Sequence, residues 1–300
     1  MRLGLDFGGT NLKIGVYNEN ADEQAFEEVP LKKASEEHGY DEGLFRILQK
    51  FFEKYHITRG GLAIKGLVNR VTGELINDIG AGNIFANTNL KELLQREFGV
   101  PFVIENDARA YTYGEFKFGA GKDFDSIVVM TLGTGLGCAS VINRKLYYSS
   151  DPLSGVLGGH LTIDRNGPEC PCGNRGCLEL YCSATALRKI ISESHPELKD
   201  EKNILEKFFQ DSLQNKDYNK TLKEFHNNLA MGIVNVIHAY GPEAVILGGG
   251  VLNSSEKIIS YVQEIVDKRA WTYPKGKVKI LKSKLGNRAA SLGVAFLEGN

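Results

Sequence analysis

The sequence predicts an α/β protein with a duplicated fold, in which two similar halves pack around a central cleft. Apolar runs with the alternation of strands take turns with amphipathic helical stretches, which is the pattern of layered α/β folds. Two glycine turns of one design, Asp6-Phe-Gly-Gly-Thr10 and Thr131-Leu-Gly-Thr-Gly135, each join a buried strand to a return strand and lie 125 residues apart. The repeated design favours a duplication, although two such turns can also arise independently.

The first half is expected to begin with a β-hairpin and to continue with alternating helices and strands. Leu3 and Leu5 alternate up to Asp6, and the return strand runs through Ile14 and Val16. Apolar residues three and four positions apart mark the helices that follow. The further expected elements are a helix across 44–52, a strand at 61–64, loops to about 88, a helix across 90–98, a strand at 102–104 and a helix at 106–118.

The second half restarts the pattern near residue 126 and contains more helix. Its expected elements are strands at 127–130 and 139–142, a helix across 178–194, a polar stretch at 195–220, a long helix through 229–237, a strand at 244–247, a helix near 255–268, a strand at 278–281 and a helix near 287–298. No linker rich in Pro, Gly and Ser separates the halves. We therefore expect a small N-terminal domain over 1–118, completed by the helix at 287–300, and a larger domain over 119–286.

The composition is typical of a globular protein that acts on a small molecule. Hydrophobic residues make up 42% of the chain and charged residues 24%, which is enough to build a sizeable core. The 36 Lys and Arg residues balance 37 Asp and Glu residues, so the protein lacks the field that would hold a nucleic acid or an anionic membrane. No window approaches the roughly 18 apolar residues of a membrane span, and a cytoplasmic protein is expected.

Three of the five cysteines belong to a cluster that predicts a structural zinc site in the loop 160–177. An odd number of cysteines argues against a disulfide framework, and Cys138 and Cys182 are expected to be small buried residues. One imidazole and three thiolates form a closed tetrahedral set, which suits structural Zn²⁺ rather than a catalytic metal. The predicted ligands are His160, Cys170, Cys172 and Cys177.

The chain contains 34 glycines, more than is usual for its length. Some of them lie in three turns that can bring backbone N–H groups close to an anion. A tight turn is the simpler explanation for any one of them, but a phosphate chain held between two halves needs donors from both. The third turn also follows a buried strand at its carboxyl end, where ligands bind in α/β folds. The turns are Gly8-Gly9-Thr10, Gly133-Thr134-Gly135 and Gly248-Gly249-Gly250.

These motifs resemble those of the ROK family of sugar kinases and regulators, which belongs to the group with the duplicated actin-like, ribonuclease-H-like ATPase fold. The resemblance covers nearly the whole chain and is most specific at the zinc loop, which contains Gly159-His160 and Cys170-Pro-Cys172-Gly-Asn-Arg-Gly-Cys177-Leu-Glu179. The other matching segments are two phosphate motifs, a catalytic segment and an adenosine segment, at Asp6–Thr10, Thr131–Gly135, Glu105–Ala108 and Gly248–Gly250 respectively.

The resemblance implies transfer of the γ-phosphoryl group of ATP to a sugar hydroxyl, usually that on C6. Asp107 matches the general base that takes the proton of the attacking hydroxyl, whereas the residues alone favour a helix N-cap for the Asn-Asp pair. Glu179 matches a sugar ligand, and its alternative is a solvated carboxylate at a helix start. The implied sugar contacts are Gly66, Asn83, Asn106, Asp107, His160 and Glu179.

The resemblance implies further that ATP, Mg²⁺ bound with the nucleotide and structural Zn²⁺ are the cofactors, and that the protein is a homodimer. Asp6 would arrange Mg²⁺ through water, while Thr10 and Thr134 hold phosphate oxygens. The zinc ion would brace the sugar-binding loop. The implied ATP contacts are Asp6, Gly8, Gly9, Thr10, Gly133, Thr134, Gly135, Gly248, Gly249 and Gly250.

Two departures from the family pattern leave the identity of the sugar open. Leu157 stands where glucokinases of the family carry a sugar-binding Glu, and Lys65 stands where Pro commonly precedes Gly66. An aliphatic side chain cannot accept a hydrogen bond from a hydroxyl, so a free glucose-like ring would lose a polar contact. We expect a hexose or a hexose derivative, with glucosides substituted at the anomeric carbon as a candidate.

Alternative functions follow from the same resemblance. The substrate can be N-acetylmannosamine, N-acetylglucosamine or a β-glucoside, and a non-catalytic sugar-binding regulator is the alternative of a different class. A repressor of the family would need a helix-turn-helix domain before the first phosphate motif, where this sequence has five residues. Four aromatic residues, Tyr147, Tyr148, Trp271 and Tyr273, fit an interface, the sugar site or the core equally well.

Overall fold

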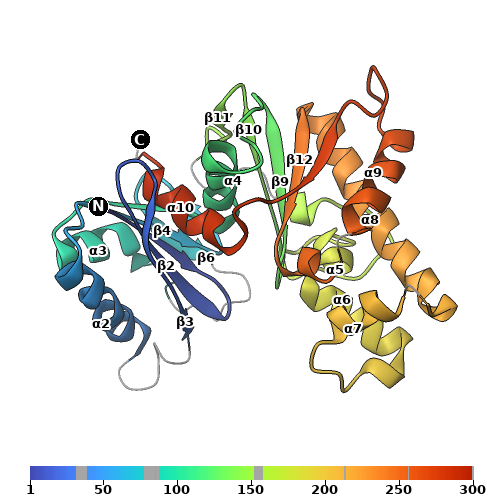
Figure 1. Ribbon diagram of the computed structural model, residues 1–300, viewed down its shortest axis with the longest axis horizontal. Coiled ribbons are helices and arrows are strands. Elements are labelled where there is room, and N and C mark those ends of the chain that lie inside the picture. The colour runs from blue at the N-terminus through green and yellow to red at the C-terminus, as the bar shows by residue number, and fades with distance from the viewer. Residues whose placement is uncertain are drawn as a thin grey trace. The chain divides into compact units, whose positions relative to one another are not determined.

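The computed structural model describes residues 1–31, 39–77, 85, 88–151, 158–212, 214–255 and 257–298. The chain forms two compact units (Figure 1). The first comprises Met1–Gly119, Leu146–Gly155 and Asn287–Asn300, and the second comprises Ala120–Lys145 and Val156–Gly286. The first unit thus includes Leu146–Gly155, a segment that the sequence placed in the second domain.

A five-stranded sheet with the strand order β3-β2-β1-β4-β8 forms the centre of the first unit. β1 pairs antiparallel with β2 in the hairpin and parallel with β4, which pairs parallel with β8. Leu5, Ile14 and Leu62 place their side chains in the core of this unit and are fully buried. The strands are β1 (Arg2–Phe7), β2 (Asn11–Tyr17), β3 (Glu23–Pro30), β4 (Arg59–Ile64) and β8 (Phe102–Asn106).

The sheet of the second unit repeats this topology in the order β11-β10-β9-β12-β13. Here β9 pairs antiparallel with β10 and parallel with β12, which pairs parallel with β13. The repetition confirms the predicted duplicated α/β fold, because each strand of one sheet has a counterpart at the same place in the other. The strands are β9 (Ile127–Leu132), β10 (Leu136–Ile142), β11 (Lys145–Leu146), β12 (Ala244–Gly248) and β13 (Lys279–Lys282).

Two glycines allow the last helix of the first unit, α10 (Ala289–Phe296), to lie directly on β1 and on α4 (Asp107–Phe118). A methyl group at Gly4 would collide with the carbonyl oxygen of Ser291, and one at Gly293 would collide with the carbonyl oxygen of Ala110. The unit also contains α2 (Gly39–Lys54) and α3 (Leu90–Phe98). The segment that closes the described chain therefore completes the packing of the unit in which the chain begins.

Helices predominate in the rest of the second unit, where one expected helix is broken in two and one further helix was not predicted. The helix expected across 178–194 is broken at Ser183, whose hydroxyl accepts a hydrogen bond from the N–H of Ala186 and so starts a new helix. The polar stretch at 195–220 contains a helix with the buried residues Phe208 and Phe209. The helices are α5 (Glu179–Cys182), α6 (Ala184–Ser194), α7 (Ile204–Asp211), α8 (Asn219–Tyr240) and α9 (Lys257–Arg269).

The segment expected to form loops up to residue 88 contains a small antiparallel sheet with the order β5-β6-β7. Its strands are β5 (Leu67–Asn69), β6 (Glu74–Asn77) and β7 (Thr88–Asn89), which are too short to show a hydrophobic period. The edge strand β3 was also missed, because half of its residues are charged or amide side chains that face solvent.

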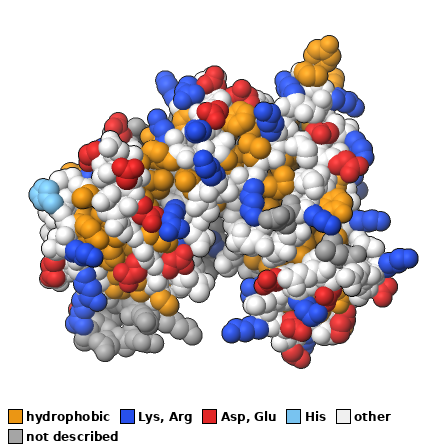
Figure 2. Space-filling model, viewed as in Figure 1, with side chains coloured by type: hydrophobic (Ala, Val, Ile, Leu, Met, Phe, Trp, Pro, Cys, Tyr) orange, Lys and Arg blue, Asp and Glu red, His pale blue; other side chains and the backbone are white. Residues whose placement is uncertain are grey.

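The surface carries both signs of charge interspersed on the face drawn in Figure 2. Trp271 and Tyr273 are 91% and 92% exposed, which removes the core as an explanation for these two aromatic residues. Cys138 and Cys182 are buried, as expected from their apolar surroundings. No helix among the described residues is long and apolar enough to cross a membrane.

Candidate functional site

The predicted site residues of the first unit lie at the carboxyl ends of its parallel strands. Asp6 is the penultimate residue of β1, Asn106 is the last residue of β8, and Gly66 follows β4 by two positions. Asp6 is in register with Ala63, and Ile64 is in register with Asn106, so the three ends meet at one edge of the sheet. This is the edge at which α/β folds bind their ligands.

Asn106 fixes the orientation of the segment around Asp107 through both ends of its side-chain amide. Its Nδ2 donates to the carbonyl oxygen of Gly66 at 3.2 Å. Its Oδ1 accepts from the N–H groups of Ala108 at 3.0 Å and Arg109 at 3.3 Å, which makes Asn106 the N-cap of α4. The side chain therefore links the helix start to the Gly66 turn and places Asp107 in the first turn of α4.

The carboxyl group of Asp107 has the properties of a general base that works near neutral pH. Burial and the neighbouring charge of Asp6 raise the pKa of Asp107 from 3.8 to about 6, against the lowering effects of the Ala108 N–H and of the Lys65 charge. Its Oδ1 accepts from that N–H at 2.8 Å. A carboxylate with a pKa near 6 is ionised at pH 7 and is a stronger proton acceptor than an ordinary aspartate.

Lys13, which the motif analysis did not name, pairs with the predicted site residue Asp6. Its Nζ donates to Oδ2 of Asp6 at 2.8 Å, and the Asp6 residue is only 7% exposed. The two residues face each other across the β1–β2 hairpin, where they are partners in register. Counting the hairpin register from the glycine turn would have found this pair in the sequence.

The two phosphate hairpins use part of their own backbone donors inside the turn. The N–H of Gly8 donates to the carbonyl oxygen of Asn11 at 3.1 Å, and that of Gly133 donates to the carbonyl oxygen of Gly135 at 3.0 Å. These two glycines therefore shape the turns, and their N–H groups are engaged. Whether the glycines of these turns contact phosphate stays a prediction.

In the second unit, Glu179 and the Gly248–Gly250 turn lie close to the ends of β9 and β10. Oε2 of Glu179 accepts from the N–H of Leu136 at 2.7 Å, so this carboxylate is attached to the hairpin and is not a solvated helix-start residue. A methyl group at Gly135 would collide with it. Gly249 has φ +90°, and a methyl group there would collide with the backbone of Leu132. Both glycines thus permit close backbone approaches.

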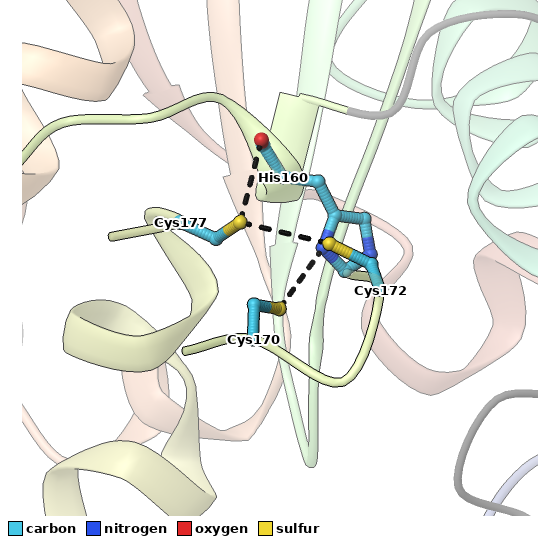
Figure 3. Close-up of side chains that lie close together, drawn as sticks. All are labelled: His160, Cys170, Cys172 and Cys177. Carbon is cyan, nitrogen blue, oxygen red and sulfur yellow. Dashed lines mark hydrogen bonds between the residues drawn. The ribbon is translucent and has the colours of Figure 1, made fainter. Parts of the chain in front are cut away.

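The four predicted metal ligands converge from one loop (Figure 3). Their ligand atoms all lie within 4.8 Å of one another. His160 Nδ1 is 3.6 Å from Cys170 Sγ, and Cys172 Sγ is 3.7 Å from Cys177 Sγ. Tetrahedral Zn²⁺ requires about 3.6 Å between nitrogen and sulfur and about 3.8 Å between sulfurs, from Zn–N near 2.05 Å and Zn–S near 2.3 Å. The cluster therefore fits a closed zinc site.

The loop that carries these ligands is held by its own backbone and by one amide side chain. Nδ2 of Asn174 donates to the carbonyl oxygen of His160 at 3.2 Å and to the hydroxyl of Thr162 at 2.9 Å. Gly176 has φ +63°, and a methyl group there would collide with the carbonyl oxygen of Asp164. The glycine therefore allows the chain to double back so that the cysteines face the histidine.

Asn83, a predicted sugar contact, and Leu157, a departure from the family pattern, lie outside the described residues. The remaining predicted residues fall into two groups. Asp6, Gly66, Asn106, Asp107 and the Gly8–Thr10 turn lie in the first unit, and Glu179 lies in the second with the turns Gly133–Gly135 and Gly248–Gly250.

Comparison with known proteins decides the family. A sequence model of the ROK family matches residues 2–299. This chain belongs to the ROK family. It is 30% identical to a glucokinase of Thermotoga maritima, in an alignment that covers 98% of this chain and 96% of that enzyme. It is 32% identical to the xylose repressor of Bacillus subtilis over 79% of this chain, and it spans only 60% of the length of that repressor.

Solved structures of the ROK family share the fold. The ROK glucokinase from Streptomyces griseus, solved in complex with glucose and AMPPNP, matches with a TM-score of 0.81 and 25% identity. The match covers 98% of this chain and 97% of that one. The predicted family and the predicted actin-like ATPase fold are thereby confirmed. Because the ROK family contains both glucokinases and repressors, the reaction has to be inferred from the residues of the site.

Proposed function

We propose that this protein is an ATP-dependent sugar kinase. Its proposed substrate is a hexose or hexose derivative, which it phosphorylates on the C6 hydroxyl group. The observation that supports it best is the environment of Asp107. This carboxylate lies in the first turn of α4, beside Asn106 and the Gly66 turn, with a pKa raised to about 6. A repressor that only binds a sugar does not need a base tuned in this way.

In this proposal Asp107 accepts the proton of the sugar hydroxyl as the hydroxyl oxygen attacks the γ-phosphorus of ATP. The new bond forms between the sugar oxygen and phosphorus, the bond between phosphorus and the β,γ-bridging oxygen breaks, and ADP leaves. Asn106, Gly66, His160 and Glu179 are proposed to orient the sugar. Asn106 is held in place by its bonds to Gly66 and to α4.

The proposed phosphate site contains residues of both hairpins. Gly9, Thr10, Thr134 and Gly135 are proposed to hold phosphate oxygens, since the N–H groups of the glycines that precede them are engaged in the turns. Mg²⁺ bound with the nucleotide would neutralise phosphate charge, and the buried carboxylate of Asp6 suits a water-mediated contact to it. The Gly248–Gly250 turn is proposed to contact adenosine.

Zinc is proposed to be structural. The four ligands would close the coordination sphere of the metal, so no position would be left for a substrate. His160 Nδ1, which lies 3.6 Å from Cys170 Sγ, would hold the metal, and Nε2 of the same ring would remain for the sugar. The metal would thereby fix a ring that contacts the substrate.

The likeness to the xylose repressor favours one other function, that of a non-catalytic sugar-binding regulator. Kinases for N-acetylmannosamine, N-acetylglucosamine or β-glucosides stay within the main proposal, because Lys65 changes the sugar side of the site and leaves the phosphate hairpins intact.

The test is an ADP-release assay with glucose, N-acetylmannosamine, N-acetylglucosamine, fructose, allose and cellobiose. We expect one of them to be phosphorylated by the wild type and none by Asp107→Asn. Glu97→Gln, an exposed carboxylate on α3, is the matched control and should keep full activity. A wild type that binds a sugar but releases no ADP would support the regulator, and activity in Asp107→Asn would disprove the assigned base.

A further inference from the structure

The described chain also contains a buried polar cluster in which only Glu105 belongs to a motif of the sequence analysis. It is centred on Glu105, which is 1% exposed, and Arg109, which is 6% exposed. Arg109 Nη1 lies 3.3 Å from Glu105 Oε1 and forms an ion pair with it. Tyr148 donates its hydroxyl hydrogen to the other carboxylate oxygen, Oε2, at 2.9 Å. A buried charge pair of this kind is retained only where its groups are well bonded.

The cluster touches the proposed catalytic segment directly. Glu105 precedes Asn106 on β8, and Oε1 of Glu105 accepts from the backbone N–H of Asn106 at 2.8 Å. The carboxylate therefore bonds the residue that caps α4 and that precedes Asp107. Any rotation of the Glu105 side chain would release that N–H and loosen the start of the helix.

Tyr148 is held over this cluster by two arginines. The guanidinium carbon of Arg70 lies 4.5 Å from the centre of the Tyr148 ring, and that of Arg109 lies 5.6 Å from it. Arg70 also donates to the carbonyl oxygen of Ser149 at 3.5 Å. Burial and the Glu105 carboxylate raise the pKa of Tyr148, so its hydroxyl keeps the proton that it donates.

The hydrogen bond between Tyr148 and Glu105 also matters because of where Tyr148 lies in the chain. Tyr148 belongs to Leu146–Gly155, which is part of the first unit, whereas the residues on either side of that segment belong to the second. The chain runs on from it to His160, the metal ligand that is proposed to contact the sugar. The hydrogen bond from Tyr148 to Glu105 thus attaches residue 148, twelve positions before His160, to β8, the strand that ends at Asn106.

We propose that Tyr148 is a positioning residue for phosphoryl transfer, because its hydroxyl fixes the carboxylate of Glu105 and that carboxylate fixes Asn106 beside Asp107. The inference rests on the proposed kinase function. It differs from a structural role, in which the ring of Tyr148 would serve only to fill space between the two arginines.

The variant that separates these roles is Tyr148→Phe, which keeps the ring and removes the hydroxyl. Glu105→Gln is less suitable, because it leaves the buried Arg109 without its counter-charge and can prevent folding. The matched control is Tyr147→Phe, which removes a hydroxyl from the neighbouring side chain, 40% exposed. Both variants are measured at a temperature well below the melting point of the less stable one.

We expect kcat of Tyr148→Phe to fall about tenfold, less than the roughly 100-fold that a misplacement of 1 Å can cost. The KM for ATP should stay within about twofold of that of the wild type, because the phosphate hairpins are not part of the cluster. Hydrogen exchange of the Asn106 amide should become faster, since its acceptor is no longer held. Tyr147→Phe should change none of these.

Amide exchange makes the test independent of turnover. If the wild type phosphorylates no sugar, the kinase proposal fails, and exchange at Asn106 still decides whether Tyr148 orders this segment. Unchanged kcat in an active enzyme, or unchanged exchange at Asn106, would overturn the positioning role. A lowered melting temperature with normal kcat and normal exchange would assign Tyr148 to packing alone, and so would equal effects in Tyr147→Phe.

Discussion

Replacing the proposed base should make the protein more stable while it removes activity. In Asp107→Asn the carboxylate becomes a neutral amide, which can still accept the N–H of Ala108 through its oxygen. Burial and the charge of Asp6 raise the pKa of Asp107 to about 6 in the folded protein, above its ordinary 3.8. The folded chain therefore holds this proton more tightly than the unfolded chain does, and ionising the group above pH 6 costs stability.

The size of this effect follows from the pKa shift. About two pKa units at 1.36 kcal/mol each give a cost of about 3 kcal/mol at pH 8, which falls to about 1 kcal/mol at pH 4.5, where the folded form keeps the proton. Asp107 is partly exposed, and solvent screening reduces both values. We expect Asp107→Asn to gain about 2 kcal/mol at pH 8, equivalent to a rise of about 4–8 °C in the melting temperature of a unit of this size.

Urea unfolding followed by circular dichroism measures this gain at pH 8 and at pH 4.5. Glu97→Gln, on the exposed face of α3 in the same unit, controls for the loss of one negative charge. The stabilisation should be clear at pH 8 and small at pH 4.5 for Asp107→Asn, and absent at both for the control. A destabilised variant at pH 8, or a gain that does not depend on pH, would refute the assigned environment of Asp107.

Two further predictions concern the reaction and the metal. With saturating MgATP, kcat/KM for the sugar should be half-maximal near pH 6 and should fall to about a tenth of its plateau at pH 5, since only that fraction of Asp107 is then ionised. Lys65→Met should move this midpoint upward, because the charge of Lys65 lowers the pKa of Asp107; an unmoved midpoint, or one near pH 4, would contradict the assignment. Metal analysis should find about one zinc per chain in the wild type and much less in Cys172→Ser. Because the metal stabilises the fold, this variant should also melt at a lower temperature. Undiminished zinc in Cys172→Ser would exclude Cys172 as a ligand.

Elements with a strong local signal were predictable from the sequence. The two hairpins were found because strand alternation and glycine turns coincide, and their repetition indicated the duplicated sheet. The break at Ser183 has a capping signal that was passed over, namely a serine before a new apolar period. The helix α7 was missed although Ile204, Leu205, Phe208 and Phe209 are buried at helical spacing, because the helix is only eight residues long and polar residues dominate the stretch around it.

The candidate site was predictable only where a motif carries it. Asp107 and the four zinc ligands were found because their chemistry depends on residues close together in the chain. Glu105 and Tyr148, which lie 43 positions apart, meet only in the folded protein, and no local pattern joins them. Lys13 lies between these cases, since its pairing with Asp6 follows from the register of a single hairpin.

The packing of α10 on β1 and α4 has a consequence for how the protein is made. Residues 1–119 are synthesised early. Gly4 packs against Ser291, and Ala110 packs against Gly293, so this part of their surface is covered only after α10 has been synthesised. All residues of the second unit, which ends at Gly286, are synthesised before that point, so this unit can fold first even though the chain begins in the other one. β8 and α4, the strand and helix beside the proposed base, therefore lack the packing surface of α10 until residues 289–296 have been synthesised.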